Sequence, residues 1–296
     1  MTNRPLVICC LFLSSVVLSP AIGQKKDIPV FHAESRLVEV SATVLDDRGR
    51  YVDNLPQEAF GIFDNGEKQE IKNFEANSES LHCALLLDTT GSMTDALPRL
   101  QNSVVNFIDA LGSEDSVAIF TFDEQMVVRQ AFTTDKAAAK RAILRLQASG
   151  RTALFDALSE ATETVSEQPG KKAIVVFTDG DDNASALNAQ AAVNRAKKNG
   201  IPLYTIAEGD ATQSPKLKNL LSDLSASTGG QTYEVKSAKQ MEEVFQKISG
   251  ELRHLYLLSY YPSALPTDGK WRKIDVKVDS VKDPRIRARD GYFPRH

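Results

Sequence analysis

The sequence predicts an α/β fold: a doubly wound, mostly parallel sheet inserted in, or flanked by, a small β-sandwich built from the N- and C-terminal segments. Between residues 82 and 252, short apolar runs alternate with segments that repeat apolar residues every three or four positions, which is typical of alternating strands and helices. On both sides of this region, apolar and polar residues alternate at every second position, as in half-buried strands. We therefore expect sandwich segments at 24–76 and 253–296 and the α/β domain at 82–252.

The first 23 residues have the composition of an export signal. Arg4 supplies a positive start, residues 6–21 are mostly apolar, and Ala21-Ile22-Gly23 offers small residues for cleavage. Serines and a proline interrupt the apolar run, which is shorter than the roughly 20 residues that span a bilayer. No later stretch is apolar enough to span. We therefore expect an exported, periplasmic or extracellular chain with no membrane span after cleavage of residues 1–23.

Charge and cysteine content argue against a nucleic-acid-binding protein and against a disulfide-stabilised fold. The chain has 35 Lys and Arg against 39 Asp and Glu, and the two signs are interspersed, so no polycationic face for nucleic acid is expected. Cys9 and Cys10 leave with the signal, which leaves Cys83 without a partner for a disulfide. We expect Cys83 to be a small buried residue in a core strand.

The two ends of the chain are expected to pair into the sandwich. In the N-terminal segment, Val38–Val44 alternates apolar and polar residues. The runs Phe60–Phe63 and Ile71–Phe74 flank Asp64-Asn65-Gly66, and Asn-Gly is a strong hairpin signal because both residues tolerate positive φ. The C-terminal segment contains three further strand patterns, at 255–260, 274–278 and 285–289.

The middle of the chain carries the strand and helix patterns of a parallel sheet. Four short apolar runs predict strands at 84–87, 117–122, 173–177 and 203–206. Helical spacing of apolar residues predicts helices at 97–111, 154–165 and 241–252. Such alternation favours a parallel sheet that is covered by helices on both faces.

Three oxygen-rich segments lie directly after a predicted strand or at a helix start. They are Asp88-Thr89-Thr90-Gly91-Ser92, Ser149-Gly150-Arg151-Thr152 and Thr178-Asp179-Gly180. Ligands bind at the carboxyl ends of parallel strands, so we expect these segments to converge. They supply carboxylates and hydroxyls without His or Cys, a donor set that selects Mg²⁺, Ca²⁺ or Mn²⁺ over zinc or copper.

Asp88-Thr-Thr90-Gly-Ser92, together with Thr152 and Asp179, resembles the metal-ion-dependent adhesion site of von Willebrand factor type A domains. The resemblance covers about residues 82–250, including the order of strands and helices. It implies that the hydroxyls of Thr90, Ser92 and Thr152 bind the ion directly, and that Asp88 and Asp179 bind it directly or through water. Thr90 replaces the usual Ser, and its extra methyl group restricts χ1.

The resemblance implies a non-enzymatic adhesion or interaction module. One divalent cation is expected, Mg²⁺ first and Ca²⁺ or Mn²⁺ as alternatives. A protein partner would present an Asp or Glu carboxylate that completes the octahedral coordination of the ion.

Five motifs lie on the two sides of the α/β domain: Val52-x-x-Leu55, Asp64-Asn65-Gly66-x-x-Gln69-x-Ile71, Tyr256-x-Leu258-x-Tyr260-x-Pro262, Trp271-Arg272 and Arg289-Asp290-Gly291-Tyr292. With these motifs, the flanking segments resemble the von Willebrand factor A-related family of exported bacterial proteins.

Other interpretations compete with this one. The Asp88 segment also resembles the first motif of Mg²⁺-dependent haloacid dehalogenase-like phosphatases, in which Asp88 would accept a phosphoryl group and Lys172 would belong to a later motif. Thr89 stands where that motif has lysine. A metal-free structural assembly protein is a third class. Asp179–Asn183 hints at an EF-hand calcium loop, but Ala184 and Gln190 occupy the positions that require Gly and Glu. Asp181 and Asp182 are instead expected to form a solvated acidic rim near the ion.

Overall fold

A computed structural model of the chain describes residues 37–76, 80–263 and 269–294. The expected signal segment, 1–23, and residues 24–36 of the expected N-terminal sandwich segment lie outside the described residues. None of the described helices is both long enough and apolar enough to cross a membrane.

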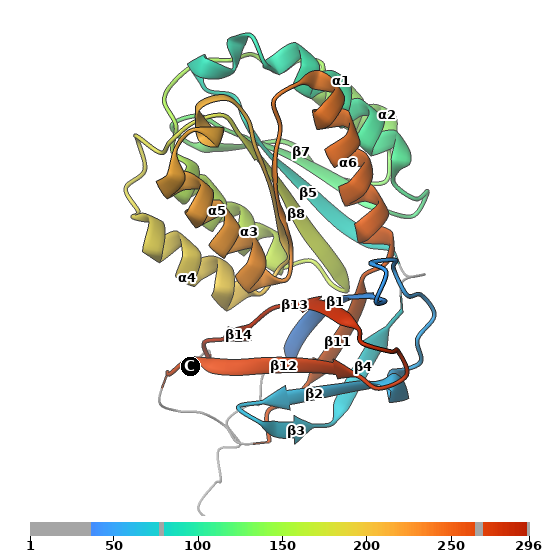
Figure 1. Ribbon diagram of the computed structural model, residues 1–296. Helices are drawn as coiled ribbons and strands as arrows, with labels where there is room; N and C mark the ends of the chain where they lie inside the picture. The colour runs from blue at the N-terminus through green and yellow to red at the C-terminus, as the bar shows by residue number, and fades with distance from the viewer. Residues whose placement is uncertain (1–36, 77–79, 264–268, 295–296) are drawn as a thin grey trace, which may run out of the picture. The chain divides into compact units, whose positions relative to one another are not determined.

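A six-stranded sheet forms the centre of the α/β domain (Figure 1). Its strands run in the order β10-β9-β8-β5-β6-β7, and all neighbours are parallel except β7, which runs antiparallel to β6 at one edge. The strands are β5 (Leu81–Asp88), β6 (Ser116–Phe122), β7 (Met126–Thr133), β8 (Lys171–Thr178), β9 (Leu203–Ala207) and β10 (Thr232–Glu234). The predicted fold class, a mostly parallel sheet with flanking β-structure, is confirmed.

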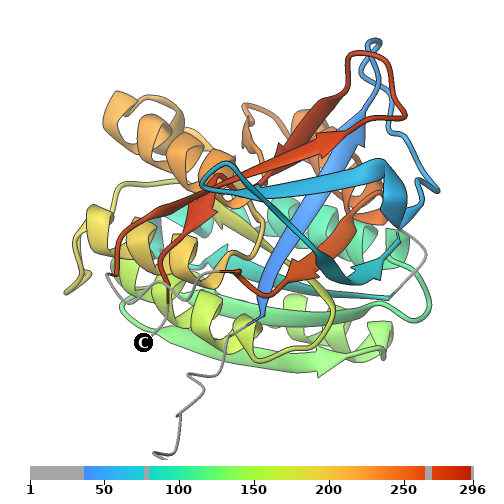
Figure 2. The ribbon, with the colours of Figure 1, turned by 90° about the horizontal axis from the view of Figure 1, so that it is seen from below.

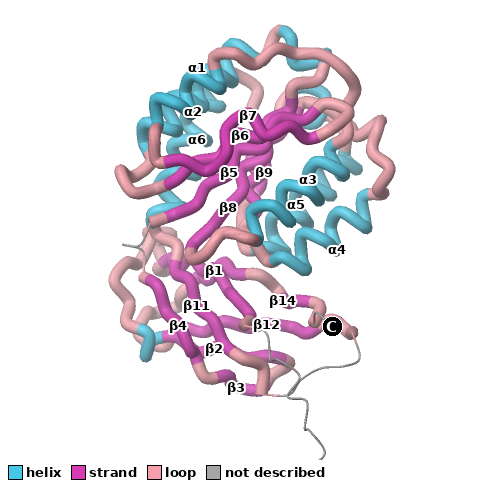
Figure 3. Tube along the Cα trace, turned by 180° about the vertical axis from the view of Figure 1, so that it is seen from behind, coloured by secondary structure: helices cyan, strands magenta, loops and turns pink. Residues whose placement is uncertain are grey.

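Helices cover both faces of this sheet (Figure 3). One face packs against α1 (Leu97–Ala110), α2 (Lys136–Ile143) and α6 (Ala238–Arg253), and the other against α3 (Leu154–Ser166), α4 (Ala189–Asn199) and α5 (Pro215–Thr228). Each helix presents an apolar stripe to the sheet because its apolar residues recur every three or four positions. Cys83 is fully buried in β5, as expected. Helices therefore cover both faces of the central strands, whose ends stay open to ligands.

Strands from the two ends of the chain interleave in two antiparallel sheets. The first has the order β13-β1-β11-β4 and the second β14-β12-β2-β3. In Figure 2 the blue strands from the N-terminal part lie beside the red strands from the C-terminal part. The strands are β1 (Val38–Leu45), β2 (Phe60–Asp64), β3 (Glu67–Gln69), β4 (Ile71–Glu75), β11 (Tyr256–Tyr260), β12 (Arg272–Val278), β13 (Arg285–Ala288) and β14 (Gly291–Tyr292). Their inner faces share one apolar core.

The Asn65-Gly66 turn joins different strands from those expected. Both turn residues have positive φ, and the turn connects β2 to β3 rather than to the run at 71–74. That run forms β4, which pairs with β11 in the other sheet. The chain therefore changes sheets between Gln69 and Ile71, a step that local alternation of apolar residues does not reveal.

A buried carboxylate lies at the centre of the sandwich. Asp64 has no exposed surface; its Oδ1 accepts a hydrogen bond from Arg272 Nε at 2.7 Å. Its Oδ2 accepts hydrogen bonds from the hydroxyls of Tyr260 at 3.1 Å and Tyr292 at 2.8 Å. We refer to these four residues as the Asp64 cluster. Since they come from β2, β11, β12 and β14, the flanking motifs in which they occur serve to hold the sandwich together.

The end of α6 is tied to the sandwich by a second buried carboxylate. Glu251 has no exposed surface and forms an ion pair with Arg287 of β13 at 2.8 Å. It also accepts a hydrogen bond from the Tyr204 hydroxyl at 3.0 Å. Burial raises the pKa of Glu251, and the charge of Arg287 opposes that shift.

Candidate metal centre

The two predicted aspartates lie at the carboxyl ends of adjacent strands. Asp88 is the last residue of β5, and Asp179 directly follows β8. β5 and β8 are paired in parallel up to Leu87 and Phe177, so both strands end at the same edge of the sheet. The topology therefore brings together two carboxylates that are distant in sequence, as expected for a ligand site in a parallel sheet.

Asp88 is held in place by hydrogen bonds to both of its carboxylate oxygens. Oδ1 accepts from the backbone N–H of Thr90 at 2.9 Å and from its hydroxyl at 2.7 Å. Oδ2 accepts from the hydroxyl of Thr178 at 2.9 Å. Since Asp88 has no exposed surface, these contacts fix the orientation of its carboxylate.

Two hydroxyl groups connect the two aspartates. The hydroxyl oxygens of Thr90 and Ser92 are 3.1 Å apart, and Ser92 Oγ donates to Asp179 Oδ1 at 2.9 Å. Thr90 has an extended backbone and precedes the 3₁₀ turn Gly91–Thr94, which places the two hydroxyls on the same side of the loop. Four of the five predicted residues thus lie in one continuous chain of polar contacts.

Thr152 belongs to a loop that crosses the Asp88 segment. Ser149 N–H donates to Thr89 O at 2.8 Å, and Gly91 N–H donates to Gly150 O at 3.2 Å. Gly150 has φ +82°, and a Cβ there would lie 3.1 Å from Asp123 Cβ, so a side chain would be strained at this crossing. Thr152 is 4% exposed.

Asn183 positions Thr152 from the loop after β8. Its Oδ1 accepts a hydrogen bond from Thr152 N–H at 3.1 Å, and its own backbone N–H donates to Thr152 O at 2.9 Å. The loop of Thr152 is therefore fixed to both of the segments that carry the aspartates. Neither Asn183 nor Thr178 was predicted as a ligand, although Thr178 lies in one of the three oxygen-rich segments and Asn183 in the polar run after Asp179.

The electrostatics of the centre favour a cation. Burial, followed by the charges of Asp88 and Glu208, raises the pKa of Asp179 to about 6, although its hydrogen bond from Ser92 opposes the shift. Burial also raises the pKa of Asp88, against the opposing effect of its hydrogen bonds from Thr90 and Thr178. Within the described part of the chain, no Lys, Arg or His forms an ion pair with either carboxylate. Two buried acids without a protein counterion fit a bound metal ion.

A third acid adds to the negative charge. Glu208 directly follows β9 and is 4% exposed. Arg99 donates two hydrogen bonds to its Oε1, at 3.1 and 2.7 Å, whereas its buried Oε2 has no hydrogen-bond partner among the described residues. Glu208 was missed because its role arises from the position of β9 beside β8, which the sequence alone does not fix.

The acidic segment after Asp179 divides into different roles. Asp181 is exposed, in keeping with the expected solvated rim. Asp182 instead caps α3, because its Oδ2 accepts hydrogen bonds from Phe155 N–H at 3.0 Å and from the Ser185 hydroxyl at 2.5 Å. Across the described residues, no three His, Cys, Asp or Glu side chains are grouped to hold a metal. A metal at this centre therefore depends on hydroxyl ligands as well as carboxylates.

The structure places Lys172 far from Asp88. Lys172 pairs with His82 near the start of β5, whereas Asp88 ends that strand, so about 20 Å of strand separates them. Lys172 also forms an ion pair with Glu39 at 2.7 Å. The phosphatase interpretation therefore loses the lysine that it assigned to a later motif.

Comparisons with known proteins agree with the fold. The family model of the von Willebrand factor type A domain matches residues 83–247. A UPF0353 protein of Mycolicibacterium vanbaalenii is 24% identical over 198 residues, which cover 57% of this chain and 59% of the relative. The UPF0353 protein MAV335 of Mycobacterium avium is 26% identical over 199 residues, with the same two coverages. The chain thus spans less than two thirds of the length of these curated relatives.

Solved structures with the same fold include two informative neighbours. A von Willebrand factor type A protein from Catenulispora acidiphila aligns with a TM-score of 0.54 and 13% identity, covering 86% of this chain and 73% of that one. Proximal thread matrix protein 1 from the mussel byssus, with a zinc-occupied metal-ion-dependent adhesion site, aligns with a TM-score of 0.52 and 18% identity. That alignment covers 61% of this chain and 47% of the mussel protein. At these identities the likeness shows the fold alone.

Proposed function

Because the chain belongs to the von Willebrand factor type A domain family, we propose that it is a non-enzymatic protein-binding module that binds an acidic residue of a partner through a divalent cation. Domains of this family mediate protein interactions and bind a divalent metal at the metal-ion-dependent adhesion site. The ligands that we propose are the two carboxylates and three hydroxyls of the candidate metal centre: Asp88, Thr90, Ser92, Thr152 and Asp179.

The observation that carries this proposal is the pair of buried carboxylates without a protein counterion. Asp88 and Asp179 are 0% and 9% exposed, and the Thr90 and Ser92 hydroxyls lie between them. A buried unpaired carboxylate costs several kcal/mol, and a divalent cation compensates two such charges at once. Each hydroxyl donates its single proton to a carboxylate, so the lone pairs of both oxygens remain available as ligands.

The donor set also supports the choice of ion and partner. It contains only oxygen, which favours Mg²⁺, with Ca²⁺ or Mn²⁺ as alternatives. When bound, the ion supplies a Lewis-acidic centre that accepts a carboxylate. Five protein oxygens leave an octahedral ion one ligand short, and an Asp or Glu side chain of a partner protein can provide it.

We also propose that the chain is exported after cleavage of residues 1–23 and acts in the periplasm or outside the cell. In the mature chain, segments 24–76 and 253–296 would form the sandwich, and residues 82–252 the α/β domain between them. Arg4, the apolar run at 6–21 and the small residues at 21–23 support this proposal.

Isothermal titration with Mg²⁺, Ca²⁺ and Mn²⁺ tests the metal site. We expect binding to the wild-type protein and none to Asp88→Ala. Asp181→Ala is the matched control, because Asp181 carries the same charge near the centre but is exposed. Equal losses of metal affinity in both variants would mean that diffuse electrostatic attraction, not coordination by Asp88, binds the metal. If the wild-type protein binds no metal at millimolar concentration, with or without an acidic peptide, the metal-free assembly protein is the better interpretation.

A phosphatase assay separates the enzyme from the binding module. The protein is incubated with Mg²⁺ and acetyl phosphate, and acyl-phosphate formation is measured by mass spectrometry. We expect no modification of Asp88, because both of its carboxylate oxygens accept hydrogen bonds and the residue has no exposed surface. A phosphorylated Asp88 would contradict the proposal.

A further inference from the structure

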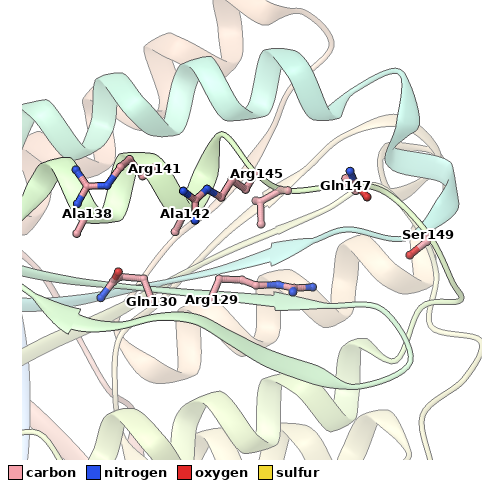
Figure 4. A pocket seen from close by; sticks show the side chains of 9 residues that line it. Arg129, Gln130, Ala138, Arg141, Ala142, Arg145, Gln147 and Ser149 are labelled. Atoms are coloured by element: carbon pink, nitrogen blue, oxygen red, sulfur yellow. The ribbon is translucent and has the colours of Figure 1, made fainter.

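A pocket rich in arginine lies between strand β7 and helix α2. Its volume is about 460 Å³, and its lining includes Arg129, Arg141 and Arg145. Figure 4 shows Arg129 on β7, Arg141 and Arg145 on the side of α2, and Ser149 at one end of the pocket. Of the described residues that line the pocket, none is acidic.

The positive charge of this pocket is poorly neutralised within the described chain. Arg141 has an exposed carboxylate, that of Asp135, at 3.8 Å, the limit of an ion pair. Arg129 donates to the neutral Thr121 hydroxyl at 2.9 Å. No described carboxylate lies within ion-pair distance of Arg129 or Arg145. Three arginine side chains, spaced along the pocket, therefore line a space that attracts an anion, and each can donate hydrogen bonds to a carboxylate.

The pocket lies next to the candidate metal centre. Ser149, which lines the pocket, donates its backbone N–H to Thr89 O at 2.8 Å, directly after Asp88. Thr152 is three positions after Ser149, so their Cα atoms are at most about 11 Å apart. A short peptide segment can thus reach from the metal centre into the pocket.

We propose that the arginine pocket is a second subsite, which binds an additional acidic side chain of the peptide segment whose Asp or Glu coordinates the metal. This inference rests on the proposed function and adds a determinant of specificity to it. The chain has a net charge of −4 at pH 7, so an acidic partner is repelled in general and requires a local concentration of positive charge. Arginine suits this role because its planar guanidinium pairs with a carboxylate through two parallel hydrogen bonds.

Peptide binding measured by fluorescence anisotropy tests the subsite. The probes are labelled hexaglutamate and a labelled glycine-rich peptide with a single glutamate, each with and without Mg²⁺. In the Arg141→Gln/Arg145→Gln variant with Mg²⁺, we expect hexaglutamate affinity to fall about tenfold and single-glutamate affinity by less than about twofold, because only hexaglutamate reaches the pocket. Arg285→Gln is the matched control, since Arg285 is an exposed arginine of the sandwich.

The outcomes separate the two proposals. If Mg²⁺ raises the affinity for both peptides but the double variant behaves like Arg285→Gln, the subsite is wrong and the metal site remains. The subsite is also wrong if both peptides lose affinity equally, since that indicates long-range attraction alone. If Mg²⁺ has no effect but hexaglutamate still depends on the arginines, the proposed metal function fails instead, and with it the link between the two sites.

Discussion

Two fully buried aspartates, Asp64 in the sandwich and Asp88 in the α/β domain, resolve the same electrostatic problem in different ways. Each has no exposed surface, and each accepts hydrogen bonds from two hydroxyl groups. Asp64 also has a cation of its own, because Arg272 contacts its Oδ1 at 2.7 Å. Asp88 has a second acid, Asp179, connected to it through Thr90 and Ser92.

The difference distinguishes a structural site from a ligand site. In the Asp64 cluster, the chain supplies both charges, so the site is complete and its strands are held together. At the candidate metal centre, the chain places two carboxylates at the carboxyl ends of parallel strands without a described Lys, Arg or His beside them, and we propose that a cation from solution neutralises them. Variants that remove the counterion of Asp64 or the charge of Asp88 test the comparison directly.

Arg272→Met gives the largest expected effect. It leaves the Asp64 carboxylate buried without a counterion, and breaking a buried ion pair in this way destabilises a protein by about 3–5 kcal/mol. The free energy of unfolding is measured by urea denaturation. Lys273→Met, at the next position, is the control. The Lys273 side chain is 65% exposed, so its substitution should change the free energy of unfolding by less than about 1 kcal/mol. Equal stability of the two variants would show that Arg272 does not neutralise Asp64.

Mg²⁺ should stabilise the wild-type protein but not Asp88→Asn. A ligand that binds only the folded state stabilises it by about 2.7 kcal/mol at 100 times its dissociation constant. The measurement is the midpoint of thermal unfolding with and without saturating Mg²⁺. Arg272→Met should unfold at a lower temperature than the wild type, but Mg²⁺ should raise its unfolding midpoint by the same amount, because the substitution lies in the sandwich and not at the metal centre. A gain of equal size in Asp88→Asn would contradict the assignment of Asp88 as a ligand.

The sequence predicted the fold where residue periodicity was strong. The apolar strands and the amphipathic helices α1, α3 and α6 follow from their spacing. Helix α4 was missed because it buries only Ala192, Val193 and Ala196, which give a weak apolar stripe. The exchange of sheets between β3 and β4 was missed because alternation shows which side chains face inward but not which strand is the partner.

The sequence predicted five ligands for the metal centre but not the residues around them. Asp88 and Asp179 could be linked in advance because parallel strands bring their carboxyl ends together. Asn183 and Glu208 act through contacts between loops, and a single sequence does not specify those contacts. The arginine pocket was not anticipated either, because Arg129 and Arg145 are separated by 16 positions and meet only when α2 packs beside β7.

Acidic pH should stabilise the metal-free protein through Asp179. Its pKa is raised to about 6 in the folded state from 3.8, so the unfolded chain releases this proton first and stability falls as pH rises from about 4 to above 6. We expect a change of about 1–2 kcal/mol, reduced from the full shift by partial solvation. Urea denaturation at several pH values measures it, and Asp179→Asn should abolish this part of the pH dependence.

With Mg²⁺ present, the pH dependence at the metal centre should change sign. The ion binds the carboxylate form, so the gain from Mg²⁺ should shrink as pH falls below about 6. Asp181→Asn is the control and should follow the wild-type curve, because its exposed carboxyl does not belong to the buried pair. A gain from Mg²⁺ that is constant between pH 4.5 and 7.5 would argue against Asp179 as a ligand.

The smallest effect is expected for Thr90→Ser. The hydroxyl that donates to Asp88 Oδ1 at 2.7 Å is kept, and only a buried methyl group is lost, at a cost of about 1 kcal/mol or less. Mg²⁺ affinity, measured by titration calorimetry, should change by less than about tenfold, since the lost methyl affects only the χ1 preference of the hydroxyl. Thr90→Val keeps the shape of the side chain but removes its oxygen, and it should weaken Mg²⁺ binding far more. If the Val and Ser variants bound Mg²⁺ equally well, the Thr90 hydroxyl would not be a ligand. The Thr90 hydroxyl would then resemble the hydroxyls of Tyr260 and Tyr292, which only donate hydrogen bonds to Asp64, and the contrast between the two sites would disappear at this position.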